Sequence, residues 1–190
     1  MARTTVDAQD DASAMRAMRA GDREALAMLY DRYSSAAYGL ALRITNDVTM
    51  AEDAVQEAFV SAWRQCGRFD AARGQVRSWL LTIIHHKAVD AVRRRAGRSE
   101  RSLPEDPETF VSTRGNPVEI AEWSAEAAAV REAMRLVPDD QRLTIEMAYF
   151  MGLTHVEIAE RMSVPLGTVK SRLRIGLEKM RGHLAMKVLE

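Results

Sequence analysis

The chain has 190 residues, and 27 Lys and Arg balance 27 Asp and Glu, so its formal net charge is zero. Apolar residues make up 47% of the chain, which excludes wholesale disorder, and the single cysteine, Cys66, excludes an internal disulfide framework. No run of about 20 apolar residues is present, and the mixed-charge start is not typical of a signal peptide. We therefore expect a cytoplasmic protein that does not insert into a membrane.

The zero net charge conceals blocks of opposite sign. Residues 61–98 hold nine Arg or Lys against two Asp, and residues 161–190 hold seven against two Glu. Between them, residues 99–160 hold thirteen acids against five Arg. The two basic blocks indicate two places where a polyanion could bind, although solvated helix faces would produce the same pattern.

Helical periodicity predicts an N-terminal helical domain over residues 14–96. Apolar residues recur at helical spacing over 15–38, with a break at Gly21 and Asp22, where Asp22 can cap a new helix. No alternating strand pattern competes with this interpretation. The first half of the domain is therefore predicted to be a pair of helices.

Two further helices are expected in the same domain. Thr49 and Glu52 have the spacing of a capping box, which predicts a helix that runs to about Cys66. One face of that helix is apolar, and a loop follows at residues 67–74. A long helix is expected over 76–95, with three consecutive arginines at its C-terminal end.

A second helical domain is predicted over residues 120–186. Residues 97–119 contain prolines, glycine and several acids without periodicity, which is typical of a flexible linker. After the linker, periodicity and breaker residues predict helices over 118–137, 141–151, 154–162 and 165–184. The fold class expected for the whole chain is thus all-α, with two small helical domains joined by a linker.

The C-terminal domain carries the pattern of a helix-turn-helix. Thr154 and Glu157 can form a capping box, and Pro165 suits the first residue of the following helix. The second helix of such a motif can enter the DNA major groove. Its apolar stripe is predicted to consist of Val169, Leu173, Gly176, Leu177, Met180 and Leu184. Polar and basic residues occupy the opposite face, as base and phosphate contacts require. The alternative is an ordinary surface helix.

Two motifs together resemble a known family. Residues 53–63 resemble region 2.2 of bacterial sigma factors of the extracytoplasmic-function (ECF) group, in the sigma-70 family. Residues 68–70, 79–83 and 88–94 look like regions 2.3 and 2.4, and the segment around 167–172 is similar to region 4.2. The resemblance covers the chain from about Asp22 to Leu184. It implies a transcription initiation factor that binds RNA polymerase core, selects promoters and helps to melt the −10 element.

The resemblance also implies roles for individual residues. The region 2.2 helix would dock on the clamp helices of the largest polymerase subunit, and region 4 would meet the flap of the second subunit. The residues off the apolar stripe of the region 2.2 helix are the candidates for binding the polymerase: Asp53, Gln56, Glu57, Val60 and Arg64. A solvated face is the alternative.

The loop before the long helix would receive an unstacked base of the −10 non-template strand, and basic residues nearby would bind its backbone. The candidate −10 contacts are Arg68, Phe69, Asp70, Arg73, Arg77, His86, Lys87, Asp90, Arg93 and Arg94. Many family members have Asn at the position of His86, which puts that contact in question. Trp79 could stack on a base, but its spacing from Ile83 favours core packing.

The recognition helix of region 4 would read the −35 element in the major groove. The candidate −35 contacts are Thr168, Lys170, Ser171, Arg172, Arg174 and Lys179. Of these, Lys170, Ser171 and Arg174 are candidates for base edges, whereas Arg172 and Lys179 suit phosphates. The resemblance further implies an anti-sigma factor that covers region 2, region 4 or both.

No catalytic, cofactor or metal site is expected. Cys66 lacks a positioned base, and His85 and His86 are adjacent residues that point to different sides of a helix. Two alternatives to the sigma interpretation remain at this point. One is a dimeric helix-turn-helix regulator that acts without polymerase core, and the other is a helical adaptor without DNA function.

Overall fold

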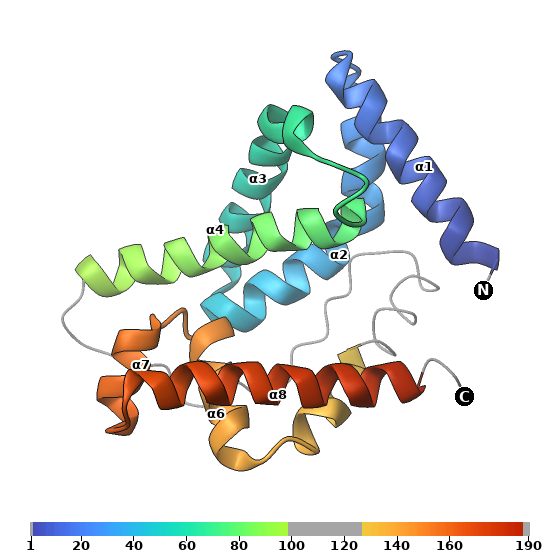
Figure 1. Ribbon diagram of the computed structural model, residues 1–190. Helices are drawn as coiled ribbons and strands as arrows, with labels where there is room; N and C mark the ends of the chain where they lie inside the picture. The colour runs from blue at the N-terminus through green and yellow to red at the C-terminus, as the bar shows by residue number, and fades with distance from the viewer. Residues whose placement is uncertain (1, 99–126, 188–190) are drawn as a thin grey trace. The chain divides into compact units, whose positions relative to one another are not determined.

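The computed structural model describes residues 2–98 and 127–187, and these residues form helices and the turns between them (Figure 1). The chain divides into two compact units, residues 1–115 and 116–190. The predicted all-α fold with two helical domains is therefore confirmed. Most of the predicted linker, together with the first residues of the helix predicted over 118–137, lies outside the described residues.

Within residues 2–98, the N-terminal unit forms four α-helices and a short 3₁₀ turn. Helices α2, α3 and α4 pack extensively against one another, and α1 packs mainly on α2. The elements are α1 (Ala2–Arg19), α2 (Arg23–Thr45), α3 (Val48–Gln65), η1 (Cys66–Arg68) and α4 (Val76–Arg98). The long fourth helix extends past its predicted end at residue 95.

Local capping residues separate these helices. Gly21 adopts φ of +88°, and the Asp22 side chain accepts a hydrogen bond from the Glu24 amide at 2.9 Å, so the break predicted there is confirmed. The predicted capping box of Thr49 and Glu52 is wrong. Asp47 caps α3 instead, since it lies earlier in the chain and its carboxylate accepts from the Met50 amide at 3.0 Å.

Small residues let the helices of the N-terminal unit approach closely. Ala37, Ala41, Ala51 and Ala58 are completely buried, and the predicted apolar face of α3 lies in the core. The larger buried side chains fill the space between the backbones, and Ile84 of α4 is fully inaccessible. The outward face of α3 is thereby left for polar residues.

Helix α1 belongs to this unit through a buried polar contact as well as through apolar packing. It begins well before the predicted domain start at residue 14, and Met15 and Met18 are buried. Asp11, 4% exposed, accepts hydrogen bonds from Arg32 at 2.5 Å and from the Tyr33 hydroxyl. Burial, together with the neighbouring Asp11 carboxylate, raises the pKa of Tyr33 well above its ordinary value.

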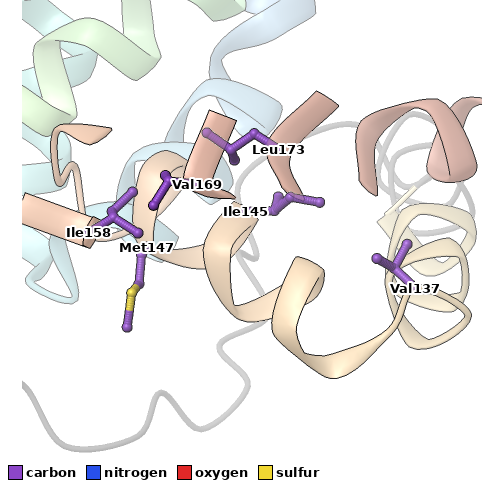
Figure 2. Packing of buried hydrophobic residues seen from close by; sticks show 6 residues of the cluster. All are labelled: Val137, Ile145, Met147, Ile158, Val169 and Leu173. Carbon is purple, nitrogen blue, oxygen red and sulfur yellow. The ribbon is translucent and has the colours of Figure 1, made fainter. Parts of the chain in front are cut away.

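The C-terminal unit is a small helical bundle. Residues 127–135 are helical, and the helices that follow are α6 (Asp139–Tyr149), α7 (His155–Met162) and α8 (Leu166–Lys187). Its core consists of apolar side chains from these helices and from Val137 just before α6 (Figure 2). The buried members are Val137, Ile145, Met147, Ile158, Val169 and Leu173.

Helices α6 and α8 pack closely at Gly176. A Cβ atom at this position would lie 2.8 Å from Cδ1 of Ile145 and 3.3 Å from Cβ of Gln141. Glycine therefore allows α8 to pack on α6 at this level. This placement agrees with the predicted position of Gly176 on the apolar stripe.

Candidate polymerase and nucleic-acid interfaces

The outer face of α3 presents all five of the residues predicted to bind polymerase. Asp53, Gln56, Glu57, Val60 and Arg64 are all exposed, and their spacing places them along one side of the helix. Val60 is 48% exposed, which leaves a branched apolar side chain in the middle of a polar stripe. An apolar residue surrounded by polar ones is the pattern expected of a protein-binding face.

Glu57 joins this face to α4. Its carboxylate lies 3.4 Å from Nζ of Lys87 and 3.8 Å from the guanidinium of Arg94. Exposed pairs at these distances contribute roughly 0–1 kcal/mol to stability, so they orient side chains more than they hold the fold. Two of the predicted −10 contacts therefore lie next to a predicted polymerase contact.

A shallow groove runs between α3 and α4 beside these ion pairs. It is lined by Met50, Asp53, Ala54, Glu57, Ala91 and Arg94, among others. At the N-terminal end of α3, Arg95 of α4 forms an ion pair with the capping residue Asp47 at 3.1 Å. The groove therefore combines carboxylates from α3 with arginines from α4, and it has a small apolar floor.

The other exposed polar residues of α4 form a neighbouring surface. His86, Asp90 and Arg93 are exposed at spacings of four and three residues, so they lie on one side of the helix. The rings of His85 and His86 make an edge contact with their centroids 5.8 Å apart. The side of α4 that carries His86 is thus available for a ligand, as the −10 prediction requires.

The loop between η1 and α4 is organised around Asp70 and Phe69. The Asp70 carboxylate accepts from the Ala72 amide at 3.0 Å, and its carbonyl accepts from the Arg73 amide. Arg68 and Arg73 are exposed. Phe69 is 8% exposed, and its ring packs edge-on against Trp79 with the centroids 5.6 Å apart.

This packing bears on two of the sequence predictions. Trp79 is partly buried against Phe69, in agreement with the core role favoured for it. Phe69, which was predicted to contact −10 DNA, lies in the wall behind the loop rather than on its surface. Arg77 is also partly buried, and its charge lies close enough to Tyr33 to affect the pKa of that hydroxyl.

The C-terminal unit contains the predicted helix-turn-helix. Thr154 and Glu157 form the expected reciprocal capping box, with hydrogen bonds of 3.2 and 2.5 Å. Ser163 ends α7 in the left-handed conformation, at φ of +52°. Helix α8 then begins at Leu166, one residue after Pro165, whose carbonyl accepts from the Val169 amide. The expected motif is confirmed to within one residue.

The exposed face of α8 carries most of the predicted −35 contacts. Lys170, Ser171, Arg174 and Lys179 are exposed, and Thr168 is half-buried. Two of these side chains make contacts within the helix: Ser171 donates to the Thr168 carbonyl at 3.0 Å, and Arg174 pairs with Glu178 at 3.0 Å. Leu177, predicted to face inward, is 36% exposed, because it lies at the edge of the apolar stripe.

Arg172 differs from the other predicted −35 residues. Its side chain is only 21% exposed, and its Nε lies 3.0 Å from the carboxylate of Asp140 on α6. The guanidinium therefore connects α8 to α6 near the start of α8. A phosphate contact from Arg172 would have to be shared with this ion pair.

Sequence reasoning missed two side chains that shape the N-terminal unit. Asp11 is buried in a segment that was described from the sequence only as mixed in charge, and Arg19 at the end of α1 donates to backbone carbonyls after α3. Neither residue belongs to a motif. A signal for Asp11 existed in the helical spacing of Asp11, Met15 and Met18, which places all three on one face.

Neither a membrane-spanning helix nor a metal-binding cluster is found among the described residues. No helix among residues 2–98 and 127–187 has the length and apolar character that a bilayer span needs. Within the same ranges, no group of three or more His, Cys, Asp or Glu side chains is arranged to hold a metal ion.

Comparisons with known proteins agree with the two motifs. The Sigma-70 region 2 model matches residues 29–98, and the Sigma-70, region 4 model matches residues 133–182. The ECF RNA polymerase sigma factor SigK of Mycobacterium bovis (strain BCG / Pasteur 1173P2) is 34% identical over 170 residues, which is 90% of this chain and 91% of the relative. SigK of Mycobacterium ulcerans is 35% identical over 176 residues, covering 92% and 94%.

A solved structure with similar sequence is that of Rhodobacter sphaeroides SigE in complex with the anti-sigma ChrR. It is 30% identical, covers 92% of this chain and 97% of its own, and superposes with a TM-score of 0.44. The family assignment rests on the sequence matches, which span both units. The dimeric regulator and the adaptor are therefore set aside, and the chain belongs to the ECF group of sigma-70 family RNA polymerase sigma factors.

Proposed function

We propose that the outer face of α3 and the groove beside it form the docking surface for the clamp helices of RNA polymerase core. Asp53, Gln56 and Glu57 supply hydrogen-bond acceptors, and Val60 supplies an apolar anchor. Interface cores combine such an anchor with a polar rim. The pairing of Glu57 with Lys87 and Arg94 restrains the rim before the partner arrives.

The loop after η1 and the exposed side of α4 are proposed to bind the −10 element. Arg68, Arg73 and Arg93 provide exposed cations for the strand backbone, and His86 and Asp90 lie on the same side of α4 as Arg93. Unstacking a base costs a few kcal/mol, so the loop must offer a shaped pocket as well as charge. The edge-on contact between Phe69 and Trp79 packs the start of this loop against α4.

Helix α8 is proposed to lie in the major groove of the −35 element. Lys170, Ser171 and Arg174 occupy its exposed face near the N-terminus, where recognition helices contact base edges. Lys179 lies further along and suits a phosphate. Breaking the Arg174–Glu178 pair would cost little, because both side chains are exposed.

Regulation and cellular location complete the proposed function. We expect the protein to act in the bacterial cytoplasm and an anti-sigma factor to hold it inactive by covering one or both binding surfaces. The polymerase core would carry out phosphodiester chemistry, so this chain contributes promoter choice and strand separation rather than catalysis. Because the α3 face is exposed in the N-terminal unit, a partner that covers it would compete directly with core binding.

The observation that best supports the proposal is the exposure of the whole α3 stripe, in which the apolar Val60 is 48% exposed among polar residues. The test is a pull-down of core polymerase with the purified chain, followed by transcription from a fragmented genomic library. We expect core binding and specific start sites, whose upstream sequences define the −35 and −10 elements. Failure to bind core in the absence of an anti-sigma factor would contradict the proposal.

A further inference from the structure

Arg19, in the last turn of α1, holds the turn from which the −10 loop begins. Its Nε donates to the Cys66 carbonyl at 3.1 Å, and its Nη2 donates to the Phe69 carbonyl. The Cys66 carbonyl also accepts from the Phe69 amide at 3.3 Å. The Arg19 guanidinium therefore binds both ends of the backbone segment from Cys66 to Phe69, which contains η1 and leads into the loop.

These carbonyls are well suited to a cation. They follow the C-terminal end of α3, where the helix dipole places partial negative charge. A planar guanidinium presents two donors in a fixed geometry, whereas a lysine ammonium is a single point of charge. Arg19 is thus matched to two carbonyls that belong to different residues.

Helix α1 is itself anchored at a distance from Arg19. Asp11 is buried and accepts from Arg32 and Tyr33 of α2, and Met15 and Met18 pack between these two points. Figure 1 shows that α1 runs beside α2 and ends near the turn that follows α3. Because its middle is fixed on α2, α1 holds Arg19 at a defined place relative to the loop.

We propose that Arg19 is a positioning residue for −10 recognition: it acts through the Cys66 and Phe69 carbonyls to keep the loop at 67–75 in the form that accepts an unstacked base. This inference depends on the function proposed above for the loop. Arg19 needs no contact with DNA in this role. With the Phe69 backbone held, its ring stays against Trp79, and the loop keeps its rear wall.

The experiment uses holoenzyme assembled from core polymerase and the full chain, with single-stranded −10 oligonucleotides from a mapped promoter. Each −10 base is replaced in turn by an abasic site, and the Kd is measured by fluorescence anisotropy. The variants are Arg19→Ala, Arg19→Lys and Arg16→Ala. Arg16 is a matched control, because it lies one turn earlier on α1, is exposed, and donates to Ser13 of the same helix.

We expect Arg19→Ala to weaken binding of the intact strand about tenfold, as loss of two charge-assisted hydrogen bonds would. The abasic substitution that most weakens binding by wild type should have little further effect in this variant, because its pocket is already lost. Arg19→Lys should resemble Arg19→Ala, and Arg16→Ala should resemble wild type. Core binding should be unchanged in all three variants. If Arg19→Ala does not fold stably, Arg19→Lys is compared with wild type instead.

Three outcomes would overturn the inference. If Arg19→Ala behaves like Arg16→Ala, the hydrogen bonds of Arg19 to the Cys66 and Phe69 carbonyls have no role in recognition. If Arg19→Lys fully restores binding, charge alone suffices and Arg19 contacts phosphate rather than the loop. If wild type itself is insensitive to every abasic site, the −10 role of the loop is refuted, and the role of Arg19 falls with it.

Discussion

The two units present their binding residues in different ways. In the N-terminal unit, Glu57 of α3 reaches Lys87 and Arg94 of α4, and Arg19 of α1 reaches the backbone after α3. In the C-terminal unit, Ser171 and Arg174 bond within α8 itself. The first surface is assembled from several helices, whereas the second is presented by one helix on a small core.

This difference predicts how each binding surface responds to a single substitution. A single substitution on α8 should remove one contact and leave the rest of its face in place. A substitution in the N-terminal unit can affect residues on a neighbouring helix. The exception in the C-terminal unit is Arg172, which pairs with Asp140 on α6 and so depends on the packing of two helices.

The largest effect is expected from the core of the C-terminal unit. Ile158 is completely buried in its apolar cluster, so Ile158→Ala should lower the free energy of unfolding of this unit by about 2–5 kcal/mol. Chemical denaturation followed by circular dichroism measures the change. Val156→Ala, on the same helix but 54% exposed, is the matched control and should change little. Equal effects of the two would show that α7 does not pack as described.

The next effect concerns core binding by the N-terminal unit. Asp53→Arg combined with Gln56→Ala should weaken binding of polymerase core about 100-fold, since charge reversal and truncation at a central site cost several kcal/mol. The fold should be intact because both residues are exposed. Asp31→Arg, the same reversal at an exposed site of α2, is the control. Unchanged core binding in the double variant would refute the α3 docking surface.

A smaller effect is expected at the −35 element. Lys170→Ala and Arg174→Ala should each cost about 1–3 kcal/mol in binding of holoenzyme to promoter DNA, with loss of discrimination at the base contacted. Lys179→Ala should instead weaken binding to all sequences equally and reduce its salt dependence. Footprinting and salt titrations separate the two behaviours. An unchanged −35 footprint in both Lys170→Ala and Arg174→Ala would mean that another face of α8 meets DNA.

The smallest effect is a pH dependence in the N-terminal unit. Because burial and Asp11 raise the pKa of Tyr33 in the folded state, folding holds this proton more tightly than the unfolded chain does. The stabilisation is complete below about pH 10, the ordinary tyrosine pKa, and is lost as pH rises further, by about 1.4 kcal/mol per pH unit. Wild type and Tyr33→Phe should therefore converge in stability above pH 10. A constant difference would contradict the proposed linkage.

The sequence alone predicted much of this molecule. Helical periodicity identified the helices, the Thr154–Glu157 capping box and Ser163–Pro165 turn located the helix-turn-helix, and two motifs identified the family. The exposure of the α3 stripe followed from its spacing opposite an apolar face. Each of these features depends on residues within one or two turns of each other, which is the range that a sequence pattern records.

Competition between neighbouring residues explains a local error. Asp47 and Thr49 both suit a helix N-cap, and the capping-box spacing favoured Thr49. The helix instead begins at Val48, so Asp47 is the N-cap and its carboxylate accepts from the Met50 amide. The predicted inward position of Leu177 failed for a related reason. A helical wheel defines a face only to within a residue's width, and α6 covers the side of α8 that carries Gly176.

What tertiary structure alone decided are the contacts between distant residues. Arg19 lies 47 residues from Cys66 and 50 from Phe69, and Lys87 and Arg94 meet Glu57 only because α3 and α4 pack together. Asp11 is a surface-type residue that became buried because Tyr33 and Arg32 offered hydrogen bonds. Local patterns specify helices and their faces, whereas the partner of a charged side chain is set by which faces the helices bury against one another.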